Sequence, residues 1–369
     1  MKSLDLATLK VNQHFARYLS YLGFLMMWLA PTSLSQSGDD PFAFFRPSVD
    51  ITREERARLD DGLPISRVLP AKGLEVGVVA AIAVKADGDR LLAWERQIEE
   101  AKKSPYVVAI RRFSNPPRLE DLAALELDSG DVSGIRSCRP GNCELKLSAA
   151  EMEQLQRAEA QPNGDQAAAI QEEFRHIVLG RVQQYLANGH IPPDEDHRAE
   201  VQPGSRFAML LDHTPFLEAR LPQLAQDLRD FPLNADPEVE SFLYWSKEHL
   251  ARKPVISVTH LSIVRNHAPG MPDALLVGRD VFSTHYVDAS LSVMALMRGD
   301  TTTKNYLVYV NRTEVDVLHG VMGGMIRHSV QAHLKSATKM MTDLRQKLES
   351  GPPPNAAPPP AAVPDRDGK

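Results

Sequence analysis

The sequence lacks the short motifs that mark common enzyme sites. It contains no GxSxG pattern for an activated serine, no HExxH zinc motif, and no GxGxxG or GxxxxGK[ST] phosphate loop. Catalytic side chains can also come together from distant strands, so this absence disfavours an enzyme without excluding one. On this evidence the sequence favours a non-catalytic protein over an enzyme.

Basic residues are in the minority. The chain has 42 Lys and Arg against 48 Asp and Glu, which gives a formal net charge of −6. Residues 1–35 carry three basic groups and one acidic group, so their removal would take the net charge to −8. Because the phosphates of nucleic acids are bound by basic surfaces, we expect no nucleic-acid partner. The 43% hydrophobic content is typical of a globular protein.

One hydrophobic run near the N-terminus is short. It extends from Tyr18 to about Ala30, follows a basic segment, and is succeeded by the small residues of Ser33-Leu34-Ser35. Its length of about 13 residues falls short of the roughly 20 that a membrane-spanning helix needs. This pattern predicts a cleaved signal peptide over residues 1–35 and export to the periplasm or beyond. The alternatives are an uncleaved anchor, which would associate with the membrane, and a hydrophobic helix of the fold.

The C-terminal segment lacks side chains that could form a core. From Ser350 it reads SGPPPNAAPPPAAVPDRDGK, and this density of proline excludes a helix or a central strand. Residues 350–369 are therefore expected to be a disordered tail. The tail is either passive or a ligand for a proline-reading domain.

The chain has only two cysteines, Cys138 and Cys143. The residues between them, Arg139-Pro140-Gly141-Asn142, are well suited to a tight turn, because proline fits its first central position and glycine its second. In an oxidising compartment the turn would bring the two thiols within bridging distance, so we predict a disulfide that pins a surface hairpin. A zinc site needs about four ligands, and no such set lies nearby. We expect no metal and no cofactor.

The order of secondary structure indicates an α+β fold interrupted by helices. The first part reads strand, helix, strand over Gly73–Lys85, Arg90–Ser104 and Tyr106–Phe113. Helices are predicted next, at Leu119–Leu125, Ala149–Arg157, Gln166–Asn188, Phe207–Leu211, Leu217–Phe231 and Glu238–Leu250. Four strands follow, at Val255–Arg265, Ala274–Val287, Ser290–Met297 and Asn305–Arg312, with a turn at Asp288-Ala289.

A long amphipathic helix is predicted last, from about Val317 to Glu349. Its apolar stripe recurs every three or four residues, at Ile326, Val330, Leu334, Ala337, Met341, Leu344 and Leu348. The resulting division is a signal peptide (1–35), a leader (36–72), a first α+β part (73–114), a helical insertion (115–250), a second α+β part (251–349) and the tail (350–369).

This order resembles the START/Bet v 1-like (polyketide cyclase) superfamily, over about 74–113 and 254–349. In that helix-grip fold an antiparallel sheet wraps the C-terminal helix around an apolar cavity. The resemblance implies binding of a hydrophobic small molecule or lipid, in a cavity lined by Met322, Met325, Ile326, Val330, Leu334 and Met341. Cys138–Cys143 and Tyr244-Trp245-Ser246-Lys247-Glu248 also resemble segments of exported bacterial proteins, from which no activity follows.

Two histidines in predicted strands are the candidates for chemistry. If the inward faces of their strands coincide, His260 and His285 would approach each other, and Tyr286 or Asp288 could orient one ring as an acid–base group. The alternative is a pair of hydrogen-bonded histidines that only stabilise the sheet. A further hypothesis is a non-catalytic module of the cell envelope, which would expose an apolar docking patch on residues 150–250.

Overall fold

The computed structural model describes residues 40–160, 165–196, 200–233, 236, 239–249, 253–301, 304–316 and 323–354, without the side chains of 300–301, 323–333 and 335–336. The predicted signal peptide lies outside the described residues, as do residues 355–369 of the predicted tail. No helix in the described part of the chain is long and apolar enough to span a membrane.

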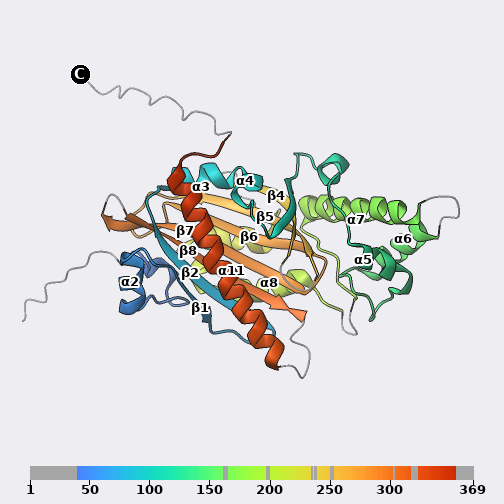
Figure 1. Cartoon of the computed structure of the whole chain (residues 1–369), viewed down its shortest axis with the longest axis horizontal. Coiled ribbons are helices and arrows are strands. Elements are labelled where there is room, and N and C mark those ends of the chain that lie inside the picture. The colour runs from blue at the N-terminus through green and yellow to red at the C-terminus, as the bar shows by residue number, and fades with distance from the viewer. Residues whose placement is uncertain are drawn as a thin grey trace, which may run out of the picture. The chain divides into compact units, whose positions relative to one another are not determined.

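An eight-stranded antiparallel sheet forms the centre of the fold (Figure 1). Its strands are β1 (Ile65–Leu69), β2 (Glu75–Val84), β3 (Val107–Arg112), β4 (Glu240–Glu248), β5 (Val255–Arg265), β6 (Ala274–Ser283), β7 (Val287–Thr301) and β8 (Lys304–Val315). The spatial order is β1-β2-β8-β7-β6-β5-β4-β3, so β5 to β8 form the predicted meander. Early in the chain, β2 pairs with the last strand, from Glu75↔Glu314 to Val84↔Asn305.

Ten α-helices lie within the described residues. They are α2 (Arg53–Asp60), α3 (Gly88–Glu95), α4 (Ile98–Ala101), α5 (Ser129–Gly134), α6 (Ala149–Glu159), α7 (Gln166–Asn188), α8 (Pro203–Asp212), α9 (Pro215–Arg220), α10 (Pro222–Asp230) and α11 (Gly323–Ser350). Three short 3₁₀ helices cover Ala43–Phe45 (η1), Leu119–Leu122 (η2) and Ile135–Ser137 (η3). The mixed α+β class with an antiparallel sheet is confirmed.

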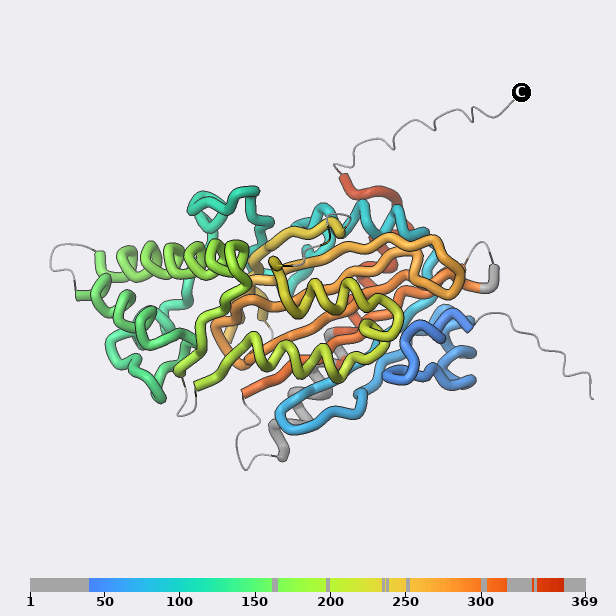
Figure 2. Tube along the Cα trace, turned by 180° about the vertical axis from the view of Figure 1, so that it is seen from behind, coloured from blue at the N-terminus to red at the C-terminus, as the bar shows by residue number. Residues whose placement is uncertain are grey.

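Different helices cover the two faces of the sheet. Figure 1 shows α11 lying diagonally across one face, where its residues Met341, Leu344 and Leu348 are buried with α3 and α4. Figure 2 shows α8 to α10 across the opposite face and α6 and α7 beyond one end of the sheet. Since side chains alternate along a strand, odd residues of β7 such as Leu291 pack toward α8, and even residues point toward α11.

Helix α7 shows how closely local sequence sets an element. The side chain of Asp165 accepts hydrogen bonds from the amides of Ala167 and Ala168, which begins the helix. Gly189 ends it at a φ of 74°, where a Cβ atom would also collide with the carbonyl oxygen of Phe231. The observed bounds, Gln166–Asn188, equal the predicted ones.

The predicted helix over Glu238–Leu250 is wrong, because Glu240–Glu248 is strand β4. Phe242 and Tyr244 are buried on the α11 face, while Leu243 and Trp245 are buried toward α7. A strand that is buried on both faces shows no polar–apolar alternation, so its sequence did not indicate a strand. Strand β1, which lies in the predicted leader, was also missed.

The predicted continuous strand over Ala274–Val287 is divided by a turn. Strand β6 ends at Ser283, and β7 begins at Val287 and includes the Asp288-Ala289 pair that was predicted to turn. The reversal instead uses Tyr286, whose φ of 62° is uncommon for a residue with a side chain. The predicted alternation of side chains through His285 therefore does not hold, because the chain turns there.

Candidate functional site

His260 lies in β5 on the face that packs against α7 and α10. Its Nδ1 is 2.8 Å from the hydroxyl oxygen of Tyr185, and the ring of Phe231 lies 4.5 Å away. Burial, together with the nearby charge of Arg279, lowers the pKa of His260 to about 4, so the ring is neutral at physiological pH. The adjoining cavity measures about 30 Å³. Such a volume holds about one water molecule and no organic ligand.

Arg279 is the charged neighbour that lowers the pKa of His260 together with burial. Its Nη1 donates to the carbonyl oxygen of Leu228, near the C-terminal end of α10, where a cation is favourable. The guanidinium also lies over the ring of Phe207 at 4.3 Å. Burial lowers its pKa, and no carboxylate pairs with it among the described residues. The group around Arg279 and His260 therefore joins α7, α8 and α10 to the sheet.

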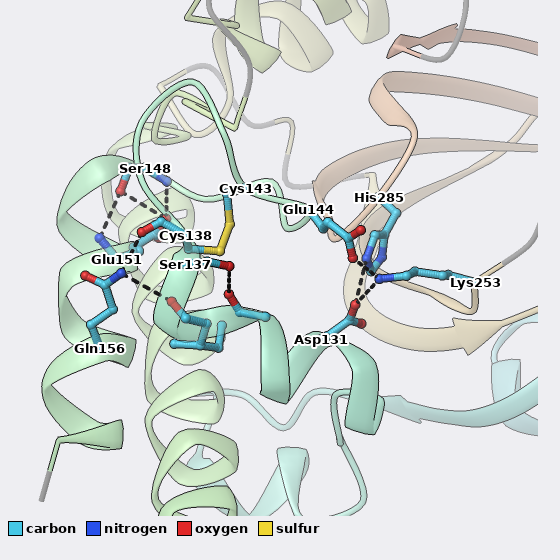
Figure 3. Close-up of a disulfide and its surroundings, with 12 residues drawn as sticks. Asp131, Ser137, Cys138, Cys143, Glu144, Ser148, Glu151, Gln156, Lys253 and His285 are labelled. Atoms are coloured by element: carbon cyan, nitrogen blue, oxygen red, sulfur yellow. Dashed lines mark hydrogen bonds and ion pairs between the residues drawn. A yellow bond between two sulfur atoms is a disulfide. The ribbon is translucent and has the colours of Figure 1, made fainter.

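His285 lies elsewhere, in the turn between β6 and β7. Its Nδ1 is 2.9 Å from Thr284 Oγ1, and its Nε2 is 3.3 Å from the Asp131 carboxylate (Figure 3). The amide of Thr284 donates to Ile256, which precedes His260 by four residues, or roughly 13 Å along a strand. The predicted histidine pair is therefore not brought together.

The other two predicted partners have different roles. Tyr286 forms the turn, and Asp288 binds the ammonium group of Lys146 at 2.6 Å instead of orienting a histidine. Lys146 also lies 3.1 Å from Asp316 and 3.4 Å from Asp196. Desolvation lowers the pKa of Lys146, but the three carboxylates outweigh it and hold the pKa above its ordinary value. This buried ion group attaches the loop after the disulfide to the sheet.

The predicted disulfide is present between Cys138 and Cys143, whose sulfur atoms are 2.09 Å apart. Gly141 takes the positive φ, 80°, that the predicted turn requires. Both cysteines are buried against Leu145 and Met152, while the turn at Pro140 is exposed. In Figure 3, Gln156 of α6 reaches the carbonyl oxygen of Cys138. The disulfide thus joins a hairpin to the core of this region and not only to the surface.

A second polar group, not predicted from the sequence, lies on the α11 side of the sheet. We call it the Lys102 cluster; its members are Glu95, Lys102, Tyr244, Glu248, Thr259, Asp280 and Tyr309. Lys102 Nζ lies 2.6 Å from Glu248 and 3.5 Å from the Tyr244 hydroxyl. Thr259 donates a hydrogen bond of 2.8 Å to Asp280. These side chains come from α3, the end of α4 and strands β4, β5, β6 and β8.

The sheet beneath α11 is not sealed. On β7, the side chains of Ser292 and Met294 keep intermediate exposure on this face, while Leu291 and Val293 on the other face are 1% and 0% exposed. Asp280 and Tyr309 on the flanking strands are also partly exposed. One face of these strands is therefore a dry core, and the other, along which α11 lies, carries side chains that water reaches.

Desolvation is the largest influence on the pKa values of Glu95, Asp280 and Tyr309 in this cluster. Burial raises the pKa of Glu95 to about 7, although Lys102 and Lys347 act in the opposite direction. Burial raises the pKa of Asp280 to about 6, against the hydrogen bond from Thr259 and the charge of Lys102. Burial likewise raises the pKa of Tyr309. Two carboxyl groups thus titrate near neutral pH inside the protein.

Several groups of the cluster lack protein partners. Glu95 is 7% exposed, yet it has no hydrogen bond or close ion pair within the described residues. It is also the last residue of α3, where the helix dipole disfavours a carboxylate. The Tyr309 hydroxyl likewise has no hydrogen bond within the described part of the chain. The oxygens of both side chains are not fully buried, so water or a ligand can reach them.

Of the predicted cavity residues, Met341 is fully buried in the core and Leu334 is partly buried beside it. Met322 and the side chains of Met325, Ile326 and Val330 lie outside the described residues. Periodicity indicated the packing stripe of α11. No sequence pattern indicated the Lys102 cluster, because its members are separated by up to 214 positions in the chain.

Comparison with known proteins supplies no assignment. The sequence matches no protein-family profile. No curated protein matches it either. Among the described residues, no group of three or more His, Cys, Asp or Glu side chains is arranged to hold a metal ion.

Proposed function

We propose that the protein binds an apolar small molecule or lipid between the sheet and α11, in a helix-grip arrangement like that of the START/Bet v 1-like superfamily. The observation that carries this proposal is the partial exposure of Ser292, Met294 and Tyr309 on the face of the sheet along which α11 lies. A face that served only as core would be packed as tightly as the opposite one.

The strand order supports the proposal. The meander from β5 to β8 returns to the early strand β2, and the chain then continues into α11 on one face of the sheet. The C-terminal end of α11 is held by α3 and α4: Lys347 donates to the carbonyl oxygens of Glu100, Ala101 and Lys103. This is the order of elements on which the resemblance rests.

The alternatives receive less support. In the described part of residues 150–250, the large hydrophobic side chains that are exposed are those of Met209 and Leu233. Two side chains are too few for a docking patch of about 400 Å². The acid–base hypothesis required His260 and His285 to share a site, and their contacts are separate. Export is part of the proposal, and the disulfide is compatible with it.

The test of the proposed function begins with the purified full-length protein. Extraction with organic solvent, followed by mass spectrometry, should recover an apolar ligand. A fluorescent alkyl probe should bind with a Kd in the micromolar range. Replacement of Ser292 by Phe would fill the space under α11 and should abolish probe binding.

The matched control is Ser133→Phe, the same change at an exposed serine of α5. It should leave probe binding unaltered. A protein that yields no extractable ligand and binds no alkyl probe, while its circular dichroism is that of a folded protein, would refute the proposed function.

A further inference from the structure

The Lys102 cluster has more acidic than basic groups facing its interior. Lys102 is already paired with Glu248 at 2.6 Å, which leaves Asp280 without a close cation among the described residues. A further anion beside Asp280 would meet the carboxyl groups of Asp280 and Glu248, whereas a cation would complete the pairing of Asp280.

The hydroxyl and ring of Tyr309 are suited to the same kind of group. Its oxygen has no hydrogen-bond partner in the described part of the chain and can accept a hydrogen bond. A protonated amine near an aromatic ring gains a further attraction to the ring face. Lys102 shows this geometry at the neighbouring tyrosine, with Nζ 5.1 Å from the ring centroid of Tyr244.

Apolar side chains border the cluster on the same face. Ile110, Met294, Leu334 and Met340 are partly buried against the core under α11. Methionine adapts its shape to irregular alkyl groups. An elongated ligand could therefore place a hydrocarbon chain against these residues while its polar end reaches Asp280.

We propose that the ligand of this face is an amphiphile with a protonated amine, held by Asp280 with Tyr309, and not a fatty acid. This inference rests on the proposed binding function and deepens it.

The experiment compares three probes of equal chain length on the full-length protein: dodecylamine, dodecanol and dodecanoate, each below its micelle concentration, measured by calorimetric titration at pH 7.5. The amine should bind roughly tenfold more tightly than the alcohol, and the alcohol more tightly than the carboxylate. Asp280→Asn should reduce the amine preference roughly fivefold without changing the affinity for the alcohol.

The matched control for that variant is Asp212→Asn, an exposed carboxylate that pairs with Arg229. It should retain the full preference. The preference should also fall between pH 7.5 and pH 5, as Asp280 takes up a proton in the presence of Lys102, Glu248 and Tyr309.

The outcomes separate the two proposals. Equal binding of amine and alcohol, or tighter binding of dodecanoate, would overturn the amine assignment and leave the binding function intact. Binding of none of the three probes, together with no ligand in solvent extracts, would overturn both. The comparison of probes on the wild-type protein requires no variant to fold.

Discussion

Lys102 and Lys146 are two lysines inside the same fold with opposite surroundings. Lys146 is 0% exposed and has three carboxylates within 3.4 Å of its ammonium nitrogen. The side chain of Lys102 is 31% exposed and has one such partner, Glu248. The nearby Glu95 carboxyl and Tyr309 hydroxyl have no hydrogen bond within the described residues. The first cluster is dry and closed, and the second is partly hydrated and incomplete.

This difference separates polar groups that are paired within the protein from polar groups that are not. A buried charge needs partners, and Lys146 obtains them from the sheet and from the loop at Asp196, so its cluster is complete without a ligand. Glu95 and Tyr309 have no hydrogen bond within the described residues, and their oxygens are not fully buried. Groups kept in that state are expected where something else binds.

The largest expected effect tests whether the two lysines differ in their contribution to stability. Lys146→Met should lower the free energy of unfolding by about 3–5 kcal/mol, because it leaves three carboxylates buried without a cation. Lys102→Met should cost about 1–2 kcal/mol, since Glu248 can be hydrated from the partly open face. Denaturant unfolding at pH 7 measures both. Equal losses would mean that the Lys102 cluster is as structural as the other.

The second test uses pH. The pKa of Glu95 rises from 4.5 to about 7 on folding, so the folded state keeps a proton that the unfolded chain releases. The wild type should therefore lose stability as pH rises from about 4.5 to about 7. Glu95→Gln removes this loss and should be roughly 2 kcal/mol more stable than the wild type at pH 8, and no more stable at pH 4. A variant that is less stable at pH 8 would show that Glu95 has a structural role.

The third test concerns the disulfide beside the Lys146 cluster. Its cysteines are five positions apart, and opening so short a loop should cost roughly 2 kcal/mol. Replacing both Cys138 and Cys143 by alanine should lower the midpoint of thermal unfolding and leave probe binding under α11 unchanged. A loss of probe binding in a folded double variant would contradict the independence of the two regions.

The smallest expected effect is tested by comparing Tyr→Phe replacements at two tyrosines. Tyr309→Phe removes a hydroxyl that makes no hydrogen bond to any described residue and should change the free energy of unfolding by less than about 0.5 kcal/mol. Tyr185→Phe removes a buried hydroxyl 2.8 Å from His260 and should cost about 1 kcal/mol or more. Chemical denaturation of both variants tests the difference. A larger loss for Tyr309→Phe would place that hydroxyl in a structural network.

Elements with local determinants were predicted well. The bounds of α7 follow from Asp165, a periodic apolar face and Gly189, which all lie within one segment. The turn between Cys138 and Cys143 likewise depends on four consecutive residues. Strand β4 was missed because aromatic and aliphatic side chains occupy both of its faces, which conceals the alternation of a strand.

The prediction of a histidine pair was wrong for a different reason. Alternation correctly placed His260 on the face of Ile256 and Val258. Beyond Ser283, however, the chain turns at Tyr286, and alternation holds only within one continuous strand. His285 consequently contacts Asp131 from another segment.

The sequence by itself determined the α+β class, the meander, the disulfide turn and most helices, because each depends on residues close together in the chain. Only the tertiary structure decided which face of the sheet is closed, and that Glu95, Glu248, Asp280 and Tyr309 lie within electrostatic reach of Lys102. These groups come from five elements, and their burial and pKa values depend on distances set by strand register and helix packing. No local pattern encodes those distances.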